Sequence, residues 1–588
     1  MGIRSCGRPG LCASTTTRLL VAGVVLTAAL WLTAEGQAAV TARVSGGTLT
    51  VSGGGAGERI AVRAASGGRI TVDVGDNGSG NFTFLRSTFS RILVKGGGGN
   101  DRLRIDESRG AFTSAERTTL AGGPGNDTLI GGRFAETLNG FTGIDTAEGN
   151  AGADTVVLGS GADFAVWDPG DGNDNVQGGS ELDTLRFNGS AAAEVFAASA
   201  MGSQLRLTRN VGAVVMRSQD VETLALNALA GVDSVTVNDL DATDITALNL
   251  SLAVGGVGDA TADTLVVNGT GAADVVAVAA VTSTVQVTGL DPQINVAGSE
   301  AANDRLTVNG LGGNDTLNGG VGLAALTQLT LDGGDGNDAL NGGNGADTLL
   351  GGNNNDTIDG NGGNDTALMG AGNDTFVWDP GDGSDIEEGQ DGVDTLLFNG
   401  SAGAEIFTAS SNGGRLLFTR NVGNIIMDTD DVEVLAVNAL GGVDTATVND
   451  LAATDITNVS LNLGVNGAGD AAADASTVNG TVGVDVMSLS GSGGSVSVAT
   501  TAYAIAVTNA EPANDTMTVN LSGGDDLLSA ANLAATSLDL TLNGGNDEDV
   551  LIASQGGDTV NCEAGTDYAD GGAGIDIGSN CETQVNIP

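Results

Sequence analysis

The sequence GGDGNDALN GGNGADTLL GGNNNDTID GNGGNDTAL MGAGNDTFV, at residues 333–377, consists of five consecutive units of nine residues. Each unit has Asp at its sixth position and a hydrophobic residue at its eighth. After two inserted residues, Trp378 and Asp379, two more units continue to residue 397. The sixth-position residues are Asp338, Asp347, Asp356, Asp365, Asp374, Asp385 and Asp394.

The two parts of each unit have different conformational requirements. The part GGxGxD favours a tight turn, because glycine adopts positive φ angles and allows close approach of the backbone. The last three residues are too few for a helix but suit a short strand with one side chain pointing inward. Two units would therefore make one coil of about 18 residues, with a turn on each side.

Stacked coils would place successive sixth-position carboxylates about 4.8 Å apart, which is the spacing of neighbouring strands. Two unit charges at this distance repel by about 1 kcal/mol in water. Residues 333–397 contain no Lys or Arg that could offset this repulsion. Ca²⁺ would offset it, because this ion takes six to eight oxygen ligands from carboxylates and backbone carbonyls. The sequence thus predicts calcium sites along the turns.

The units GGDGNDALN and GGNGADTLL resemble the RTX, or haemolysin-type, calcium-binding nonapeptide GGxGxDxUx, in which U is apolar. The resemblance implies an all-β fold, a right-handed parallel β-roll or β-solenoid, with Ca²⁺ held between turns on each side. The sixth-position Asp would be the main side-chain ligand, and loop carbonyls would supply the rest. The alternative for such a composition is a flexible Gly/Asp-rich tract.

The same pattern occurs in two other blocks. The phrase WDPGDG begins at Trp167 and again at Trp378, an offset of 378 − 167 = 211 residues, and GGNDEDVLI at Gly544 begins a third block at that offset from Gly333. Glu136 replaces Asp once in the first block, and Arg133 and the next residue depart from the turn pattern, so we expect weaker calcium loading there. The further predicted ligands are Asp127, Asp145, Asp154, Asp163, Asp174, Asp183, Asp549, Asp558, Asp567 and Asp576.

Between the blocks lie stretches rich in Val, Thr, Leu and Asn, whose recurring asparagines (Asn238, Asn268, Asn309) we expect at turns or in stacked side-chain ladders. Asp101 is interpreted as a simple turn residue, with an isolated calcium ligand as the alternative, and the GGNDTLN segment at residues 312–318 is interpreted as a single calcium-like turn. The predicted organisation is a signal peptide at 1–38, a β-rich lead-in at 39–121, a nonapeptide block at 122–186, a β module at 187–332, a second block at 333–397, a second module at 398–543 and a C-terminal block at 544–588.

Composition limits the classes of partner. The 588 residues include 96 Gly, are 40% hydrophobic but only 3% aromatic, and carry a net charge of −51. This charge favours cations as partners and disfavours nucleic acid or an anionic membrane surface. The absence of His removes the commonest general base, and no nucleophile or phosphate-binding motif stands in a suitable context. We therefore expect no enzymatic activity.

The first 38 residues have the pattern of a secretory signal peptide. Basic residues precede the apolar run LLVAGVVLTAALWL at 19–32, and cleavage near Ala38 is expected. An uncleaved N-terminal anchor is the alternative. Otherwise no stretch is apolar for long enough to span a bilayer. The mature chain is expected to be secreted, or to reside at the cell surface.

Two cysteines remain after removal of the signal peptide, Cys562 and Cys581. They are separated by 581 − 562 = 19 residues, one more than a coil of two units, and are expected to form a disulfide in an oxidising compartment. Free thiols are the alternative. The favoured function is a Ca²⁺-stabilised structural or surface-matrix component. The other candidate is an adhesin or carbohydrate-binding module that recognises a surface polysaccharide or neighbouring cells.

Overall fold

The computed structural model describes residues 40–587, which form two compact units. Unit 1 comprises residues 40–166 and 170–181, and unit 2 comprises residues 167–169 and 182–587. The predicted signal peptide lies outside the described residues. The described part contains no α-helix, and its helical turns are η1 (Arg86–Thr88), η2 (Val211–Ala213), η3 (Leu323–Ala325) and η4 (Val422–Asn424). No helix among these residues is long and apolar enough to cross a membrane.

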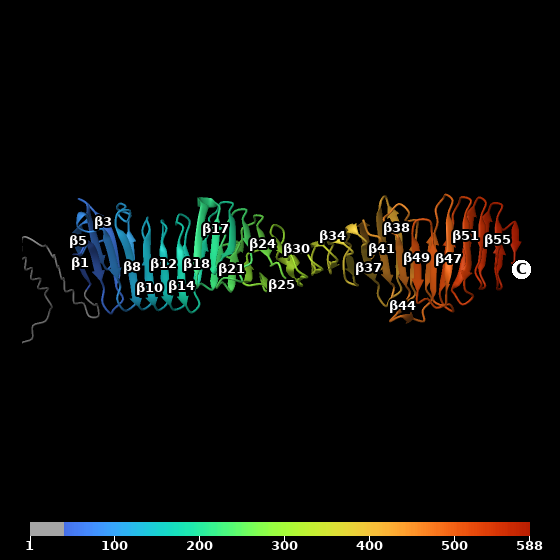
Figure 1. The fold of residues 1–588 in the computed structure, drawn as a ribbon, viewed down its shortest axis with the longest axis horizontal. Coiled ribbons are helices and arrows are strands. Elements are labelled where there is room, and N and C mark those ends of the chain that lie inside the picture. Colours follow the sequence, from blue (N-terminus) through green and yellow to red (C-terminus); the bar gives the residue numbers. More distant parts are fainter. Residues whose placement is uncertain (1–39, 588) are drawn as a thin grey trace, which may run out of the picture. The chain divides into compact units, whose positions relative to one another are not determined.

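Unit 1 consists of two sheets whose strands alternate along the chain (Figure 1). In order across the first sheet, the strands are β1 (Thr41–Ser45), β2 (Thr48–Ser52), β6 (Arg91–Lys95), β8 (Arg117–Pro124), β10 (Glu136–Thr142), β12 (Thr155–Ser160) and β14 (Asn175–Ser180). The second sheet contains β5 (Phe82–Leu85), β4 (Arg69–Val74), β3 (Arg59–Ala65), β7 (Arg102–Asp106), β9 (Thr128–Ile130), β11 (Thr146–Glu148) and β13 (Phe164–Trp167).

Unit 2 has the same two-sheet construction (Figure 1). Its first sheet contains β18 (Val214–Gln219), β17 (Gln204–Arg209), β16 (Val195–Met201), β20 (Ser234–Val237), β24 (Thr264–Asn268), β28 (Arg305–Asn309), β30 (Gln328–Asp335), β32 (Thr348–Asn353), β34 (Thr366–Gly372), β36 (Ile386–Gly392), β40 (Ile425–Asp430), β39 (Arg415–Arg420), β38 (Ile406–Asn412), β42 (Thr445–Val448), β46 (Ala475–Asn479), β50 (Thr516–Asn520), β52 (Asp539–Asn546), β54 (Thr559–Ala564) and β56 (Ile577–Ser579).

The second sheet of unit 2 contains β15 (Thr184–Asn188), β19 (Thr223–Asn227), β21 (Ala247–Ser251), β27 (Gln293–Ala297), β26 (Thr284–Thr288), β25 (Val275–Val281), β29 (Thr316–Gly319), β31 (Ala339–Asn341), β33 (Thr357–Asp359), β35 (Thr375–Trp378), β37 (Thr395–Asn399), β41 (Val434–Asn438), β43 (Asn458–Asn462), β49 (Ala504–Thr508), β48 (Ser495–Ala499), β47 (Val486–Ser492), β51 (Leu527–Leu533), β53 (Val550–Ile552), β55 (Tyr568–Asp570) and β57 (Thr583–Val585). Two small hairpins, β22 (Ala253–Val254) with β23 (Val257–Gly258) and β44 (Gly464–Val465) with β45 (Ala468–Gly469), lie outside both sheets.

The nonapeptide blocks form the predicted parallel coils. Thr348 of β32 is in register with Thr366 of β34, an offset of 18 residues, and Thr137 of β10 is in register with Thr155 of β12 at the same offset. The eighth-position residues Leu340, Leu349, Ile358, Ala367 and Phe376 are all buried, with at most 1% of their surface exposed. The eighth-position residue of each of these five units therefore lies in the core, and the β-roll prediction is confirmed.

The β modules differ from an uninterrupted parallel roll. Strand β38 pairs antiparallel with β39, which pairs antiparallel with β40, and β47, β48 and β49 form a second excursion of this kind. Strands β16–β18 and β25–β27 repeat both excursions one repeat earlier. Module coils are longer than 18 residues, and the extra residues are accommodated as antiparallel strands. The sequence prediction did not include these strands.

Two predictions about single residue types are confirmed. The asparagines form a side-chain ladder, in which Nδ2 of Asn309 donates to Oδ1 of Asn268 at 2.8 Å and Nδ2 of Asn268 donates to Oδ1 of Asn238 at 3.0 Å. Cys562 and Cys581 form a disulfide with a Cα–Cα distance of 5.1 Å. The disulfide joins β54 to the loop after β56 and thereby constrains the last coil.

Candidate metal centre

The sixth-position aspartates form a hydrogen-bonded ladder along each edge of the nonapeptide block. On one edge, the backbone N–H of Asp338 donates to Oδ1 of Asp356 at 2.8 Å, and the N–H of Asp356 donates to Oδ1 of Asp374 at 2.7 Å. On the other edge, Asp347 donates in the same way to Asp365 at 2.8 Å. Each Asp thus binds the coil before it through one carboxylate oxygen.

The second carboxylate oxygen of most of these residues has no hydrogen-bond partner among residues 40–587. It is buried, and the side chains that carry it are at most 6% exposed. A buried carboxylate oxygen without a donor is costly unless a cation compensates it. The predicted ligands with this property are Asp127, Asp145, Asp154, Asp338, Asp347, Asp356, Asp365, Asp374, Asp385, Asp394, Asp549, Asp567 and Asp576.

Glycine at the first position leaves room for these oxygens. A Cβ atom on Gly333 would lie 2.4 Å from Oδ2 of Asp338 and 2.6 Å from the carbonyl oxygen of Gly351 in the following coil. At Gly351, the corresponding distances are 2.7 Å to Oδ2 of Asp356 and 2.2 Å to the carbonyl of Met369. A carboxylate and a carbonyl oxygen therefore converge beside both of these glycines. An oxygen-only donor set of this kind fits Ca²⁺.

Burial changes the protonation of the ladder in the absence of a cation. Desolvation raises the pKa of Asp365 to about 8, and the negative charge of Asp385 contributes further. Desolvation likewise raises the pKa values of Asp347 and Asp356 to about 7. Hydrogen bonds from backbone N–H groups oppose the shifts at Asp356 and Asp365 without cancelling them. A bound Ca²⁺ would have to displace protons from these groups.

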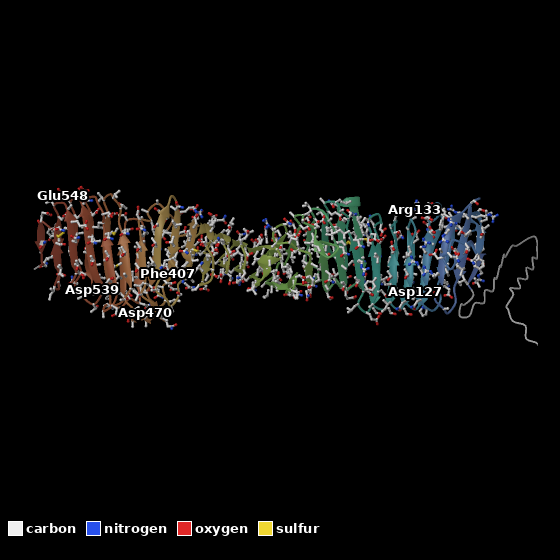
Figure 2. The ribbon with its side chains drawn as sticks, turned by 180° about the vertical axis from the view of Figure 1, so that it is seen from behind. Asp127, Arg133, Phe407, Asp470, Asp539 and Glu548 are labelled. Atoms are coloured by element: carbon white, nitrogen blue, oxygen red, sulfur yellow. A yellow bond between two sulfur atoms is a disulfide. The ribbon has the colours of Figure 1, made fainter. Side chains whose placement is uncertain are left out.

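The first block continues the ladder through the irregular unit that contains Glu136. The N–H of Glu136 donates to Oδ1 of Asp154 at 2.6 Å, and Oε2 of Glu136 accepts from the N–H of Gly132 at 2.8 Å. The turn at Arg133 therefore does not interrupt the stack, because the longer Glu side chain reaches the backbone of its own turn. Asp127 and Arg133 lie at opposite edges of unit 1 (Figure 2). The weaker calcium loading of this block stays a prediction.

Four predicted calcium ligands make further interactions within the protein and are therefore not in the set given above. Oδ2 of Asp558 accepts hydrogen bonds from the N–H and the hydroxyl of Ser554, both at 2.7 Å. At Asp558, Oδ2 is therefore occupied by protein groups. Asp163, Asp174 and Asp183 are buried at ladder positions and make further interactions within the protein.

The ladder also extends beyond the predicted residues. Asp101 is 2% exposed, accepts at Oδ1 from the N–H of Glu58 at 2.6 Å, and donates through its N–H to Oδ1 of Asp127 at 2.7 Å. Asp101 is therefore a member of the ladder, and neither a simple turn residue nor an isolated ligand describes it. Asp315 likewise donates to Asp338 at 2.7 Å. The other aspartates missed from the sequence include Asp233, Asp263, Asp274, Asp304, Asp444, Asp474, Asp485, Asp515 and Asp526.

A signal for these missed residues was present in the sequence. Many of them precede a strand whose second residue is buried, as in DSVTV at Asp233, DTLVV at Asp263 and DTATV at Asp444. The preceding turns lack the full GGxGx pattern, which is why a search for nonapeptides passes over them. The carboxylate ladder depends on the Asp and the strand that follows more than on the glycines.

The modules contain one ladder position at which the protein supplies its own cation. Glu405 is 1% exposed, and its Oε1 accepts from Nε of Arg420 at 2.5 Å. The guanidinium carbon of Arg420 lies 5.2 Å from the ring centroid of Trp378, and this ring stacks on Phe398 with centroids 4.0 Å apart. Trp378 is fully buried, as expected for a packing residue. Glu194 and Arg209 form the same ion pair one repeat earlier.

Comparison with known protein families agrees with this geometry. The family model of the RTX calcium-binding nonapeptide repeat matches residues 114–133, 130–165, 307–322, 332–367, 341–376 and 543–577. No curated protein matches the chain. The matched segments contain most of the predicted ladder aspartates of the three blocks, and they also contain Asp315. The predicted ligands outside the matched segments are Asp174, Asp183, Asp385 and Asp394. The chain therefore carries RTX calcium-binding nonapeptide repeats in three separate blocks.

Proposed function

We propose that the chain is an exported, non-enzymatic structural or surface-matrix protein whose nonapeptide blocks fold around Ca²⁺. The observation that carries this proposal is the set of buried aspartates whose second oxygen has no partner within residues 40–587. These oxygens recur with the 18-residue register of the coils, beside carbonyl groups of the following coil. Ca²⁺ bound there would supply the positive charge that the second and third blocks lack.

Export is part of the proposal. It rests on the signal-peptide pattern at residues 1–38 and on the disulfide, which belongs to an oxidising compartment. Ca²⁺ outside the cell is abundant enough for sites with dissociation constants of roughly 10⁻⁴ to 10⁻³ M. Such a protein would remain unfolded in its blocks before export and fold on reaching calcium, because binding and folding are coupled.

The test is a calcium titration of the mature chain, residues 39–588, after treatment with a chelator. We expect far-UV circular dichroism to report a gain of β structure with Ca²⁺, and direct metal analysis to find several bound ions. The variant for comparison carries Asp338, Asp347, Asp356, Asp365 and Asp374 as Asn, and should lose ions and calcium-dependent folding in the second block.

A matched control removes the same number of charges from the surface. It changes the exposed residues Asp239, Asp241, Asp391 and Asp539 to Asn and Glu548 to Gln. Asp539 and Glu548 are labelled in Figure 2. We expect this control to bind as many ions as the natural sequence. Equal binding by the natural chain and the ladder variant would refute the proposal.

A further inference from the structure

Charge is distributed unevenly along the chain. Residues 40–133 contain twelve Lys or Arg and eight Asp or Glu, a net charge of 12 − 8 = +4, whereas residues 421–588 contain no Lys or Arg. The first coils of unit 1 therefore form a net basic region in an otherwise acidic protein. Within it, a groove of about 570 Å³ lies on the outer face of the first sheet.

Two arginines line one side of this groove. Arg91 of β6 is in register with Arg117 of β8, so their side chains leave neighbouring strands at the same height. Both are exposed, and no carboxylate among residues 40–587 lies within 4.0 Å of either guanidinium group. Like charges directly opposite each other destabilise a sheet unless an anion lies between them. The pair is thus suited to bind an anionic group.

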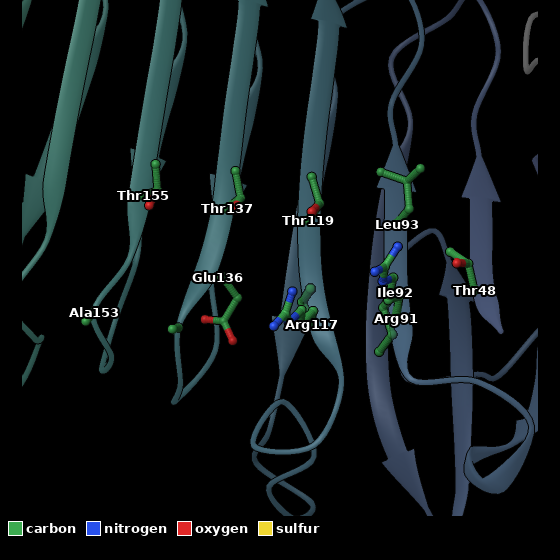
Figure 3. Close-up of a pocket in the computed structure, with 12 residues that line it drawn as sticks. Thr48, Arg91, Ile92, Leu93, Arg117, Thr119, Glu136, Thr137, Ala153 and Thr155 are labelled. Atoms are coloured by element: carbon green, nitrogen blue, oxygen red, sulfur yellow. The ribbon is translucent and has the colours of Figure 1, made fainter.

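The remaining lining supplies hydroxyl groups. Thr119, Thr137 and Thr155 occupy one row across three neighbouring strands, in register with each other (Figure 3). Glu136 is the acidic residue of the lining, but it is 3% exposed and its Oε2 accepts a hydrogen bond from Gly132. A row of hydroxyls beside two guanidinium groups matches a ligand that carries both hydroxyls and acidic groups along an extended chain.

The internal repeat provides two natural comparisons. At the equivalent position of the second repeat, Arg305 of β28 is in register with Gln328 of β30, and Nη2 of Arg305 donates to Oε1 of Gln328 at 3.3 Å. In the third repeat, Thr516 of β50 faces Asp539 of β52. The paired positions therefore change from two positive charges to one and then to a negative charge. The threonine row persists in the second repeat as Thr330, Thr348 and Thr366.

From these observations we propose that the groove between Arg91 and Arg117 binds an acidic polysaccharide, with its carboxylate groups at the arginines and its hydroxyls at the threonines. Arg binds carboxylates through paired N–H donors, which gives this contact geometric specificity. The site uses no calcium ligand and is independent of the calcium proposal, except that unit 1 must be folded. The acidic remainder of the chain would repel a polyanionic membrane or nucleic acid that covers a larger surface.

The test uses the full mature chain with Ca²⁺ present and its folding verified by circular dichroism, so that failure to fold is distinguished from failure to bind. The probe is a soluble hyaluronan decasaccharide, and binding is measured by calorimetry. We expect binding by the natural chain and a loss of at least about tenfold in Arg91→Gln/Arg117→Gln, because both charged contacts to the carboxylates are removed. The matched control, Arg305→Gln, should bind normally.

A reciprocal variant tests whether the arginine pair is sufficient. Gln328→Arg recreates the pair beside the threonines of the second repeat and should add a second binding site, seen as a doubled stoichiometry. The proposal is overturned if the natural chain does not bind hyaluronan, if the double variant binds it as well as the natural chain, or if Gln328→Arg adds no binding site. Equal binding of neutral dextran, inorganic phosphate or phosphatidylglycerol vesicles would overturn it as well.

Discussion

Buried carboxylates stack in both the nonapeptide block at 333–397 and the module that follows it. The two regions compensate this negative charge in different ways. In the block, Asp338, Asp356 and Asp374 stack with one oxygen each that has no partner in the described chain. In the module, the buried Glu405 continues a carboxylate ladder with Arg420 as its partner. The block therefore depends on a cation from solution, whereas this module position carries its own.

The largest effect should follow from calcium removal. A chelator should expose the backbone amides of residues 333–397 to hydrogen exchange, while amides of β38 to β42 in the module should stay protected longer. At free calcium 1,000 times above the dissociation constant, each site contributes about 4 kcal/mol of stability that the chelator removes. Hydrogen-exchange mass spectrometry resolves the two regions. Equal exchange rates in the block and the module would show that the block does not depend more on calcium than the module does.

The pH dependence should have opposite signs with and without calcium. Without it, the folded-state pKa values are raised, to about 7 for Asp347 and Asp356 and to about 8 for Asp365. The folded block then binds more protons than the unfolded chain. Its stability is full below about pH 4 and is lost as the pH rises towards 8. With calcium, protons compete with the ion, and stability should rise with pH.

The measurement is urea unfolding of the second block, followed by hydrogen exchange at pH 5 and pH 8. We expect the calcium-free block to be more stable at pH 5 and the calcium-loaded block to be more stable at pH 8. The five-site Asn variant provides the control, because it lacks the titrating groups and should show a much smaller difference. A calcium-free block that becomes more stable between pH 5 and pH 8 would argue against buried, protonated carboxyls.

Removal of Arg420, the cation that the module itself supplies, should lower the stability of the module whether or not calcium is present. Arg420→Met leaves the buried Glu405 with hydrogen bonds from Ser401 but without a cation, at an expected cost of about 3–5 kcal/mol that calcium does not restore. Arg415→Met is the matched control, since Arg415 is partly exposed and its ion pair with Asp428 contributes about 1 kcal/mol or less. Urea unfolding measures both. Full rescue of Arg420→Met by calcium would show that this position also accepts the ion.

The sequence predicted the block better than the module, for a physical reason. Positions such as Leu340 and Asp338 recur every nine residues, so local periodicity reveals both core and ladder. Glu405 and Arg420 are 15 residues apart and meet only because β38 and β39 pair antiparallel. Asp444 follows a turn without the glycine pattern. Its place in the ladder depends on coil stacking, which no local pattern specifies.

The two repeats differ at one core position in a way that can be tested. Glu387 of β36 is fully buried, with both carboxylate oxygens unpartnered within residues 40–587, and burial raises its pKa well above the ordinary value. The equivalent residue 211 positions earlier is Val176, which is 2% exposed. Glu387→Val should therefore stabilise the second repeat by about 1–3 kcal/mol in urea unfolding. The control Glu388→Val removes the neighbouring, partly exposed carboxylate and should not stabilise.

The smallest expected effect concerns two aspartates of the C-terminal block. Asp549 has a buried Oδ2 without a partner in the described residues, whereas Oδ2 of Asp558 accepts two hydrogen bonds from Ser554. Ser554 occupies the second position of its unit, where most other units have Gly. If an unpartnered oxygen marks a calcium ligand, Asp549→Asn should lower the number of bound ions and Asp558→Asn should leave it unchanged.

Metal analysis of the two single variants, at saturating calcium, compares residues of the same type, block and burial. Both changes remove one charge, so a general loss of electrostatic attraction for calcium would affect them equally. A difference between them can arise only from the local partners of each carboxylate. Equal loss of ions in both variants would show that the position in the nonapeptide, and not the unpartnered oxygen, determines which aspartates bind calcium.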